Sequence, residues 1–176
     1  MSWRIPFTVL ALSTGLALSS FPVVAQPSSS EEYRVLAKAE SGLSLNAVEK
    51  LLNDGDEFFL KGNYSEARKK YDEARKTSEV ILGLYGSLSN SFRGVDALIP
   101  REMDSNSRKV LALKSKANLK LATLFRKNNQ SALSVPLLVE VVRISGPAKK
   151  EGNQAYKELV ELGFVNTPFR GGRKRP

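Results

Sequence analysis

The chain has 176 residues, 41% of them apolar, and a formal net charge of +9 at pH 7. This length predicts one domain, and the apolar fraction is enough for a hydrophobic core. Because the sequence contains no His and no Cys, it excludes disulfides, thiol and His-based catalysis, haem ligation by His or Cys, and the usual zinc sites.

The first 25 residues have the pattern of a cleavable signal peptide. Arg4 supplies a short positive start, and the apolar run over 7–18 that follows is too short to span a bilayer. The Val-Val-Ala sequence that ends at Ala25 predicts cleavage before Gln26. An uncleaved anchor stays open as the alternative. With cleavage, we expect an exported protein of a periplasm or, in a phototroph, of a thylakoid lumen.

The chain after the signal peptide predicts helices joined by short connections. Residues 26–30 are rich in Pro and Ser and predict a flexible linker. A capping box at Ser29 predicts a short helix over 31–40. A second helix is expected to begin at Asn46 and to end at Lys61, before a glycine that can adopt the positive φ of a helix end.

A third helix is predicted from Ser65 to about Leu88. Its apolar and small residues recur every three or four positions, which is typical of an amphipathic helix. The predicted buried stripe is Ala67, Tyr71, Ala74, Ser78, Ile81 and Tyr85. The next segment, 90–105, is too long for an ordinary loop in a compact domain. It is either a loop over a groove or, at least in part, a short helix or a degenerate unit.

A long helix over 106–127 is predicted next, capped by Asp104 or Ser105. Its buried stripe is Val110, Leu113, Ala117, Leu121 and Leu124. Asn129 is expected to cap the following helix, which contains Pro136 and ends at Ile144.

The last helix should have Pro147 in its first turn and stop at Gly163. Its predicted buried face is Ala155, Tyr156, Leu159 and Val160. Since no segment has a strand pattern, the predicted class is all-α, with helical hairpins packed side by side. The helical domain is expected over 31–164, followed by a basic, disordered tail over 165–176.

Residues 48–74 resemble a tetratricopeptide repeat (TPR), a unit of two antiparallel helices joined by a tight turn. The residues that carry the resemblance are Gly55, Gly62, Tyr64, Ala67, Tyr71 and Ala74. Leu51 and Asp54 depart from the pattern. Leu121, Ala122, Phe125 and Ala132 resemble a second, weaker unit, whose turn lacks the glycine. A generic helical hairpin is the alternative for each unit. The resemblance implies a short superhelix.

In this family the first helix of each pair lines a concave groove that holds an extended peptide or a partner helix. The resemblance therefore implies a partner-binding groove with these residues: Glu49, Leu52, Asp56, Phe59 and Leu60 from the first unit, and Lys116, Leu119, Thr123 and Arg126 from the second. It implies a scaffold, adaptor or assembly factor with no catalytic activity and no cofactor or metal. An enzyme is the least favoured class, because no pair of carboxylates stands out.

Basic residues are concentrated between residues 100 and 127. At 100° per residue, Lys109, Lys116, Lys120 and Lys127 fall close to one line along the predicted helix, and we call these four lysines the basic ridge. A ridge of this sign attracts acidic protein surfaces, anionic lipids or nucleic acid, although the signal peptide argues against nucleic acid. The alternative function is therefore a peripheral protein that docks on an anionic membrane or cell-envelope polymer through this ridge and the tail. The ridge could also be a solvated face with no function.

Overall fold

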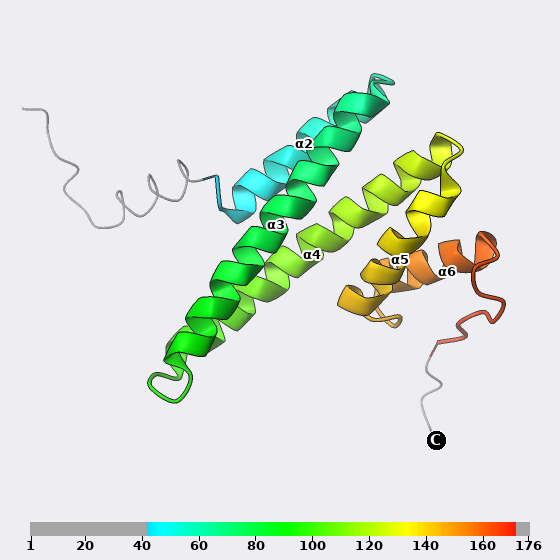
Figure 1. Cartoon of the computed structure of the whole chain (residues 1–176). Helices are drawn as coiled ribbons and strands as arrows, with labels where there is room; N and C mark the ends of the chain where they lie inside the picture. Colours follow the sequence, from blue (N-terminus) through cyan, green and yellow to red (C-terminus); the bar gives the residue numbers. More distant parts are fainter. Residues whose placement is uncertain (1–41, 172–176) are drawn as a thin grey trace, which may run out of the picture.

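The computed structural model describes residues 42–171, and this part of the chain contains helices and no strand (Figure 1). The helices are α2 (Leu45–Leu60), α3 (Tyr64–Phe92), α4 (Leu98–Lys127), α5 (Ser131–Ser145) and α6 (Lys150–Glu161). The predicted all-α class is thereby confirmed. The predicted signal peptide, linker and short helix over 31–40 lie outside the described residues, as does the end of the tail from residue 172.

Each helix packs against the next one along the chain, so the helices lie side by side (Figure 1). The alternate helices α2 and α4 also contact each other, as do α4 and α6. Helices α2, α4 and α6 therefore share one face of the array, and α3 and α5 lie on the other. Among residues 42–171, no helix is both long enough and apolar enough to span a membrane.

The first helix pair depends on a close approach between α2 and α3. Gly55 is buried, and a Cβ atom at this position would collide with the ring of Tyr71. Gly62 has a φ of 76° in the turn, a conformation that glycine adopts without strain. Ala67 is fully buried in the same contact. The small residues of the sequence motif are thus the ones that permit the close packing.

The buried stripes of the two long helices are confirmed. All five predicted residues of α4 are buried, and so are the predicted residues of α3 except Tyr85, which is partly buried. One core forms between α2, α3 and α4, and a second between α4, α5 and α6. In α6, Ala155 and Leu159 are buried, whereas Tyr156 and Val160 are only partly buried.

The two halves of the helical array repeat each other at a spacing of 67 residues. In the first half the inward positions are Val48, Leu52, Gly55, Ala67, Tyr71, Ala74 and Ser78; their counterparts are Ser115, Leu119, Ala122, Ser134, Leu138, Val141 and Ser145. All are buried except Leu119 and Ser145, which are partly buried. The turn repeats too, because Asn129 has a φ of 57° where the first turn has Gly62.

This spacing corrects the predicted second unit. Ala132 was expected to hold the position of Ala67, but Ala132 is exposed and Ser134 holds it. Asn129 does not cap α5, because it adopts the left-handed turn conformation and the helix begins two residues later at Ser131. Asn is one of the few residues other than Gly that can adopt the left-handed conformation.

The predicted ends of several helices were also wrong. Helix α2 is capped by Ser44 rather than Asn46, since the Ser44 hydroxyl accepts a hydrogen bond from the backbone N–H of Ala47 at 3.1 Å. Helix α3 continues past Leu88 to Phe92. Pro147 precedes α6 instead of lying in its first turn, because this helix begins at Lys150.

The segment 90–105 is neither a long loop nor an added repeat. Within this segment only residues 93–97, which connect α3 to α4, are not helical. Helix α4 therefore begins eight residues earlier than predicted. The Asp96 carboxylate accepts hydrogen bonds from the backbone N–H groups of Leu98 and Ile99 at 2.6 and 3.2 Å. Pro100 lies in the first turn, where a missing N–H removes no helical hydrogen bond.

Asp104 and Ser105 therefore lie inside α4 and cap nothing. The Asp104 carboxylate instead accepts a hydrogen bond from the Ser89 hydroxyl of α3, at 3.4 Å.

The described part of the tail packs back onto α6. Val165 is partly buried against the second core. The Tyr156 hydroxyl donates to the carbonyl oxygen of Thr167 at 2.7 Å, and the Tyr156 ring meets the edge of Phe169. The contacts of the helical domain thus extend past the boundary that we expected at residue 164.

Candidate functional site

A cleft of about 320 Å³ opens on the face that α2, α4 and α6 share, and we call it the α2–α4 cleft. Its volume is at the lower end of the range for ligand sites. Four helices supply its lining: Asp56 and Phe59 from α2, Tyr71 from α3, Lys116, Leu119, Lys120 and Thr123 from α4, and Gln154 from α6.

The polar centre of the cleft is the carboxylate of Asp56. It accepts a hydrogen bond from the Tyr71 hydroxyl at 2.7 Å and two from the Lys120 ammonium at 2.6 and 2.7 Å. Burial, together with the hydrogen bond to Asp56 and the negative charge of that carboxylate, raises the pKa of Tyr71 above its usual range. The Tyr71 phenol therefore stays a neutral hydrogen-bond donor at neutral pH. These three side chains fix α2, α3 and α4 to one another beneath the cleft.

Phe59, the lining residue nearest the α2–α3 turn, forms an aromatic pair with Tyr64 of α3. The rings of Phe59 and Tyr64 lie 5.4 Å apart, centroid to centroid. The Lys127 ammonium lies 5.0 Å from the centroid of the Phe59 ring and 5.1 Å from that of Tyr64. This is within the range of a favourable cation–π contact. The last turn of α4 is thereby held against the first helix pair.

The structure brings together most of the predicted groove residues. Of the nine, these five line the cleft: Asp56, Phe59, Lys116, Leu119 and Thr123. The other four do not. Leu52 is in the core, while Glu49 and Leu60 are exposed outside the cleft. Arg126 faces α6, where its guanidinium pairs with Glu158 at 2.9 Å and Glu161 at 3.1 Å.

The four lysines of the basic ridge are not equivalent. We expected all four to point into solvent, but Lys120 is bonded to Asp56 and Lys127 lies over two aromatic rings. Lys109 and Lys116 are exposed, and neither has an ion pair within the described residues. Lys116 lines the cleft. The ridge therefore offers an incoming group two uncommitted charges rather than four.

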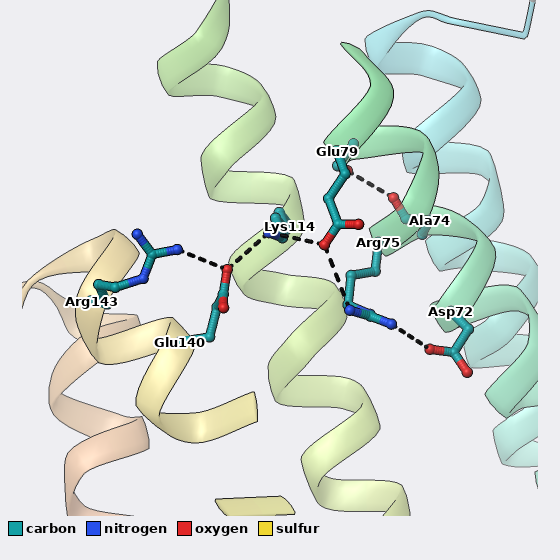
Figure 2. Close-up of polar contacts among 8 residues, drawn as sticks. Asp72, Ala74, Arg75, Glu79, Lys114, Glu140 and Arg143 are labelled. Carbon is teal, nitrogen blue, oxygen red and sulfur yellow. Dashed lines mark hydrogen bonds and ion pairs between the residues drawn. The ribbon is translucent and has the colours of Figure 1, made fainter. Parts of the chain in front are cut away.

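A separate polar network joins α3, α4 and α5 on the opposite side of α4 (Figure 2). Its centre is Lys114, whose side chain is only 11% exposed. The ammonium pairs with Glu79 of α3 at 3.1 Å and with Glu140 of α5 at 2.8 Å. Figure 2 shows the network continuing to Arg75 and Arg143. It links the two cores and adds nothing to the cleft.

Sequence reasoning missed Lys114 and Gln154. Lys114 lies directly between the buried Leu113 and Ser115, and a charge inside an apolar stripe is a signal that could have identified it. Gln154 had no such signal, because it reaches the cleft from α6, which neither predicted unit includes.

The charged side chains that line the cleft are Asp56, Lys116 and Lys120. Asp56 is the only carboxylate in its lining, and that carboxylate is bonded to Lys120 and Tyr71. Within residues 42–171 there is also no cluster of three acidic residues that could hold a metal ion. Thr123 already donates to the carbonyl oxygen of Leu119 at 3.0 Å, and Gln154 donates to the carboxylate of Glu158 at 3.1 Å. Among the described residues that line the cleft, the Lys116 ammonium and the apolar surface are therefore the uncommitted groups.

Comparisons with protein-family models, with curated proteins and with solved structures gave no match for this chain.

Proposed function

We propose that the chain is a TPR-like adaptor or assembly factor that holds an extended segment of a partner protein in the α2–α4 cleft. The observation that carries the proposal is the convergence of five predicted groove residues on one cleft. The 67-residue repeat of buried positions supports the TPR-like part, because two helix pairs of the same design stack side by side. The signal-peptide pattern of residues 1–25 supports action in a periplasm or thylakoid lumen.

The cleft suits a peptide that combines an apolar and an acidic residue. Phe59 and Leu119 offer apolar contact, and Lys116 offers a positive charge without an ion pair in this part of the chain. The Thr123 hydroxyl oxygen and the Gln154 amide oxygen can accept hydrogen bonds along the wall, although Thr123 donates to Leu119 and Gln154 to Glu158. The peptide would meet a rigid surface, because Asp56 already ties three helices together. Such preorganisation lowers the entropy cost of binding.

Docking on an anionic surface, the alternative function, has less support from the geometry. Only Lys109 and Lys116 of the basic ridge are uncommitted, and they lie about 10 Å apart along α4. Two such charges attract an anionic surface weakly. This function stays a prediction and is an outcome of the test below.

The test is site-specific photocrosslinking from a benzophenone side chain placed at Thr123, in cells that express the full chain. Val139 of α5 is the matched control, because it is exposed and lies on the other face. We expect Thr123 to crosslink to one protein that Val139 does not reach. Lys116→Glu should then weaken that complex about tenfold, whereas Lys109→Glu, an equal charge change outside the cleft, should leave it within about twofold.

Two results would contradict the proposal that the partner binds in the α2–α4 cleft. If neither charge reversal affects the complex, the partner binds elsewhere. If both reversals weaken it equally and a few hundred millimolar salt abolishes it, the anionic-surface function is the better one.

A further inference from the structure

A second hollow, of about 540 Å³, lies next to the α2–α4 cleft. We call it the α6 hollow, because α6 and the two residues before it supply all of its lining except one residue of α4. Gln154 lines both the cleft and the hollow, so the two are neighbours. A chain that lies in the cleft and continues past Gln154 therefore enters the α6 hollow.

The α6 hollow carries three positive charges that are free to meet an incoming group. Its two carboxylates, those of Glu158 and Glu161, both pair with Arg126, at 2.9 and 3.1 Å. The other charged side chains of the lining are exposed lysines without an ion pair in the part of the chain from 42 to 171. We call them the hollow lysines: Lys149, Lys150 and Lys157. Their charge attracts anionic groups.

The spacing of the hollow lysines suits an extended acidic chain better than one small anion. Lys150 and Lys157 are seven residues apart on one side of α6, or about 10 Å along the helix. An extended chain covers this distance in about three residues, so separate carboxylates can meet separate lysines. A single phosphate would instead require both long side chains to converge on one point, which costs rotamer freedom.

We propose that the partner segment continues from the α2–α4 cleft past Gln154 and places acidic side chains against the hollow lysines. This inference rests on the proposed function, because the cleft must hold a partner before the hollow can extend the contact. It adds that the segment has two parts. An apolar residue meets Phe59 and Leu119, and Asp or Glu residues to one side of it lie over α6.

An anionic membrane is a weaker candidate for the same lysines. The side chain of Glu161 is 60% exposed in the same hollow, so a surface of uniform negative charge would be repelled there while the lysines attract it. An acidic segment can place its carboxylates beside the lysines and away from Glu161. The mixed charge of the lining therefore favours a protein segment with separate charges.

The first experiment places a benzophenone side chain at Asn153, a neutral residue of the α6 hollow, in cells that express the full chain. It should capture the same protein as benzophenone at Thr123, which lines the cleft. The two attachment points in that protein should lie within about ten residues of each other, since an extended chain of this length spans about 33 Å. Asp or Glu residues should flank the Asn153 attachment point.

The second experiment reverses charges in the hollow and measures the affinity for the captured protein. Lys150→Glu combined with Lys157→Glu should weaken the complex about tenfold. Lys76→Glu combined with Lys109→Glu is the matched control. It makes the same charge change at two exposed lysines that lie outside both hollows, and it should leave the affinity within about twofold. The difference between the two pairs should shrink at about 0.5 M salt, because exposed charges are screened.

Lys150→Gln combined with Lys157→Gln repeats the test without adding negative charge. It should weaken the complex about threefold. Circular dichroism of each variant checks the helices, and the neutral pair keeps the test valid if the reversed pair does not fold.

The outcomes separate this inference from the proposed function. If Thr123 captures no protein, the proposed function fails and the inference fails with it. If Thr123 captures a partner that Asn153 does not reach, or that the reversed and neutral pairs bind with wild-type affinity, the cleft remains the site and the inference alone is overturned.

A membrane role has its own readout, which is sedimentation with vesicles made of equal parts phosphatidylglycerol and phosphatidylcholine. If the Lys150 and Lys157 variants lose vesicle binding but keep the protein complex, the hollow lysines serve a membrane and the inference is overturned.

Discussion

Lys120 of α4 donates to both carboxylate oxygens of Asp56 of α2, at 2.6 and 2.7 Å, although 64 residues separate them in the sequence. The same carboxylate accepts a hydrogen bond from Tyr71 of α3. One acidic side chain thus joins three helices at the polar centre of the α2–α4 cleft. Because Asp56 and Lys120 are each more than a third exposed, their pairing should contribute shape to the cleft more than stability.

Lys120→Glu should destabilise the fold by about 1–2 kcal/mol, because it places a second carboxylate against Asp56. Lys109→Glu makes the same charge change on the same helix at an exposed position and should cost less than about 0.5 kcal/mol. Urea unfolding of both variants measures the difference. If the two variants are equally stable, Lys120 points into solvent as the sequence pattern alone indicated.

Ala67→Leu should destabilise the fold by roughly 1–3 kcal/mol, because Ala67 is fully buried between α2 and α3 and a larger side chain forces the helices apart. Ala132→Leu is the control, since Ala132 is exposed near the start of α5. Its effect should be within about 0.5 kcal/mol. Thermal unfolding compares the two. The opposite order would restore the predicted repeat register that places Ala132 in the core.

The sequence predicts the buried stripes well, because they follow directly from the spacing of apolar and small residues. Ala67, Tyr71 and Ala74 are examples, and all three are fully or almost fully buried. The register of the second helix pair was harder to predict from the sequence. Its turn uses Asn129 in the left-handed conformation in place of a glycine, and this left no marker in the sequence.

The orientation of the basic ridge needed tertiary information. A helical wheel shows that Lys120 and Lys127 lie near one line, but it does not show which helix they face. Asp56 and Phe59, their partners on α2, are more than sixty residues earlier in the chain. The cleft itself could be predicted in outline, because five of its eight lining residues are groove positions that the sequence predicts on α2 and α4. The contribution of α6 could not.

Lys114→Met should destabilise the fold by about 1–3 kcal/mol. The substitution keeps the apolar length of the side chain but leaves Glu79 and Glu140 without their shared cation. Glu79 and Glu140 are partly exposed, so water moderates the cost. Lys116→Met, two residues along the same helix and exposed, should change stability by less than about 0.5 kcal/mol. Chemical denaturation of the two variants measures the difference. Equal stability of Lys114→Met and Lys116→Met would contradict a stabilising role of the Lys114 network.

The same network predicts how stability depends on pH. The hydrogen bond from Lys114 is the main cause that holds the pKa of the Glu140 carboxyl below its usual value of 4.5. In the folded state Glu140 therefore keeps its charge to a lower pH than in the unfolded chain. Its stabilising effect is fully present above about pH 4.5 and is lost as the pH falls through the lowered folded pKa.

Glu140→Gln should accordingly reduce stability at pH 7 and reduce the further loss of stability between about pH 5 and pH 3. Glu73→Gln is the matched control, because Glu73 is an exposed acid whose ion pair is local to α3. It should leave the acid-dependent slope nearly unchanged. The measurement is the free energy of unfolding in urea at a series of pH values. A wild-type slope in the Glu140→Gln variant would mean that Lys114 does not hold this carboxylate in solution. The link between α4 and α5 would then rest on the apolar core and on the hydrogen bond from Ser145 to Ser115.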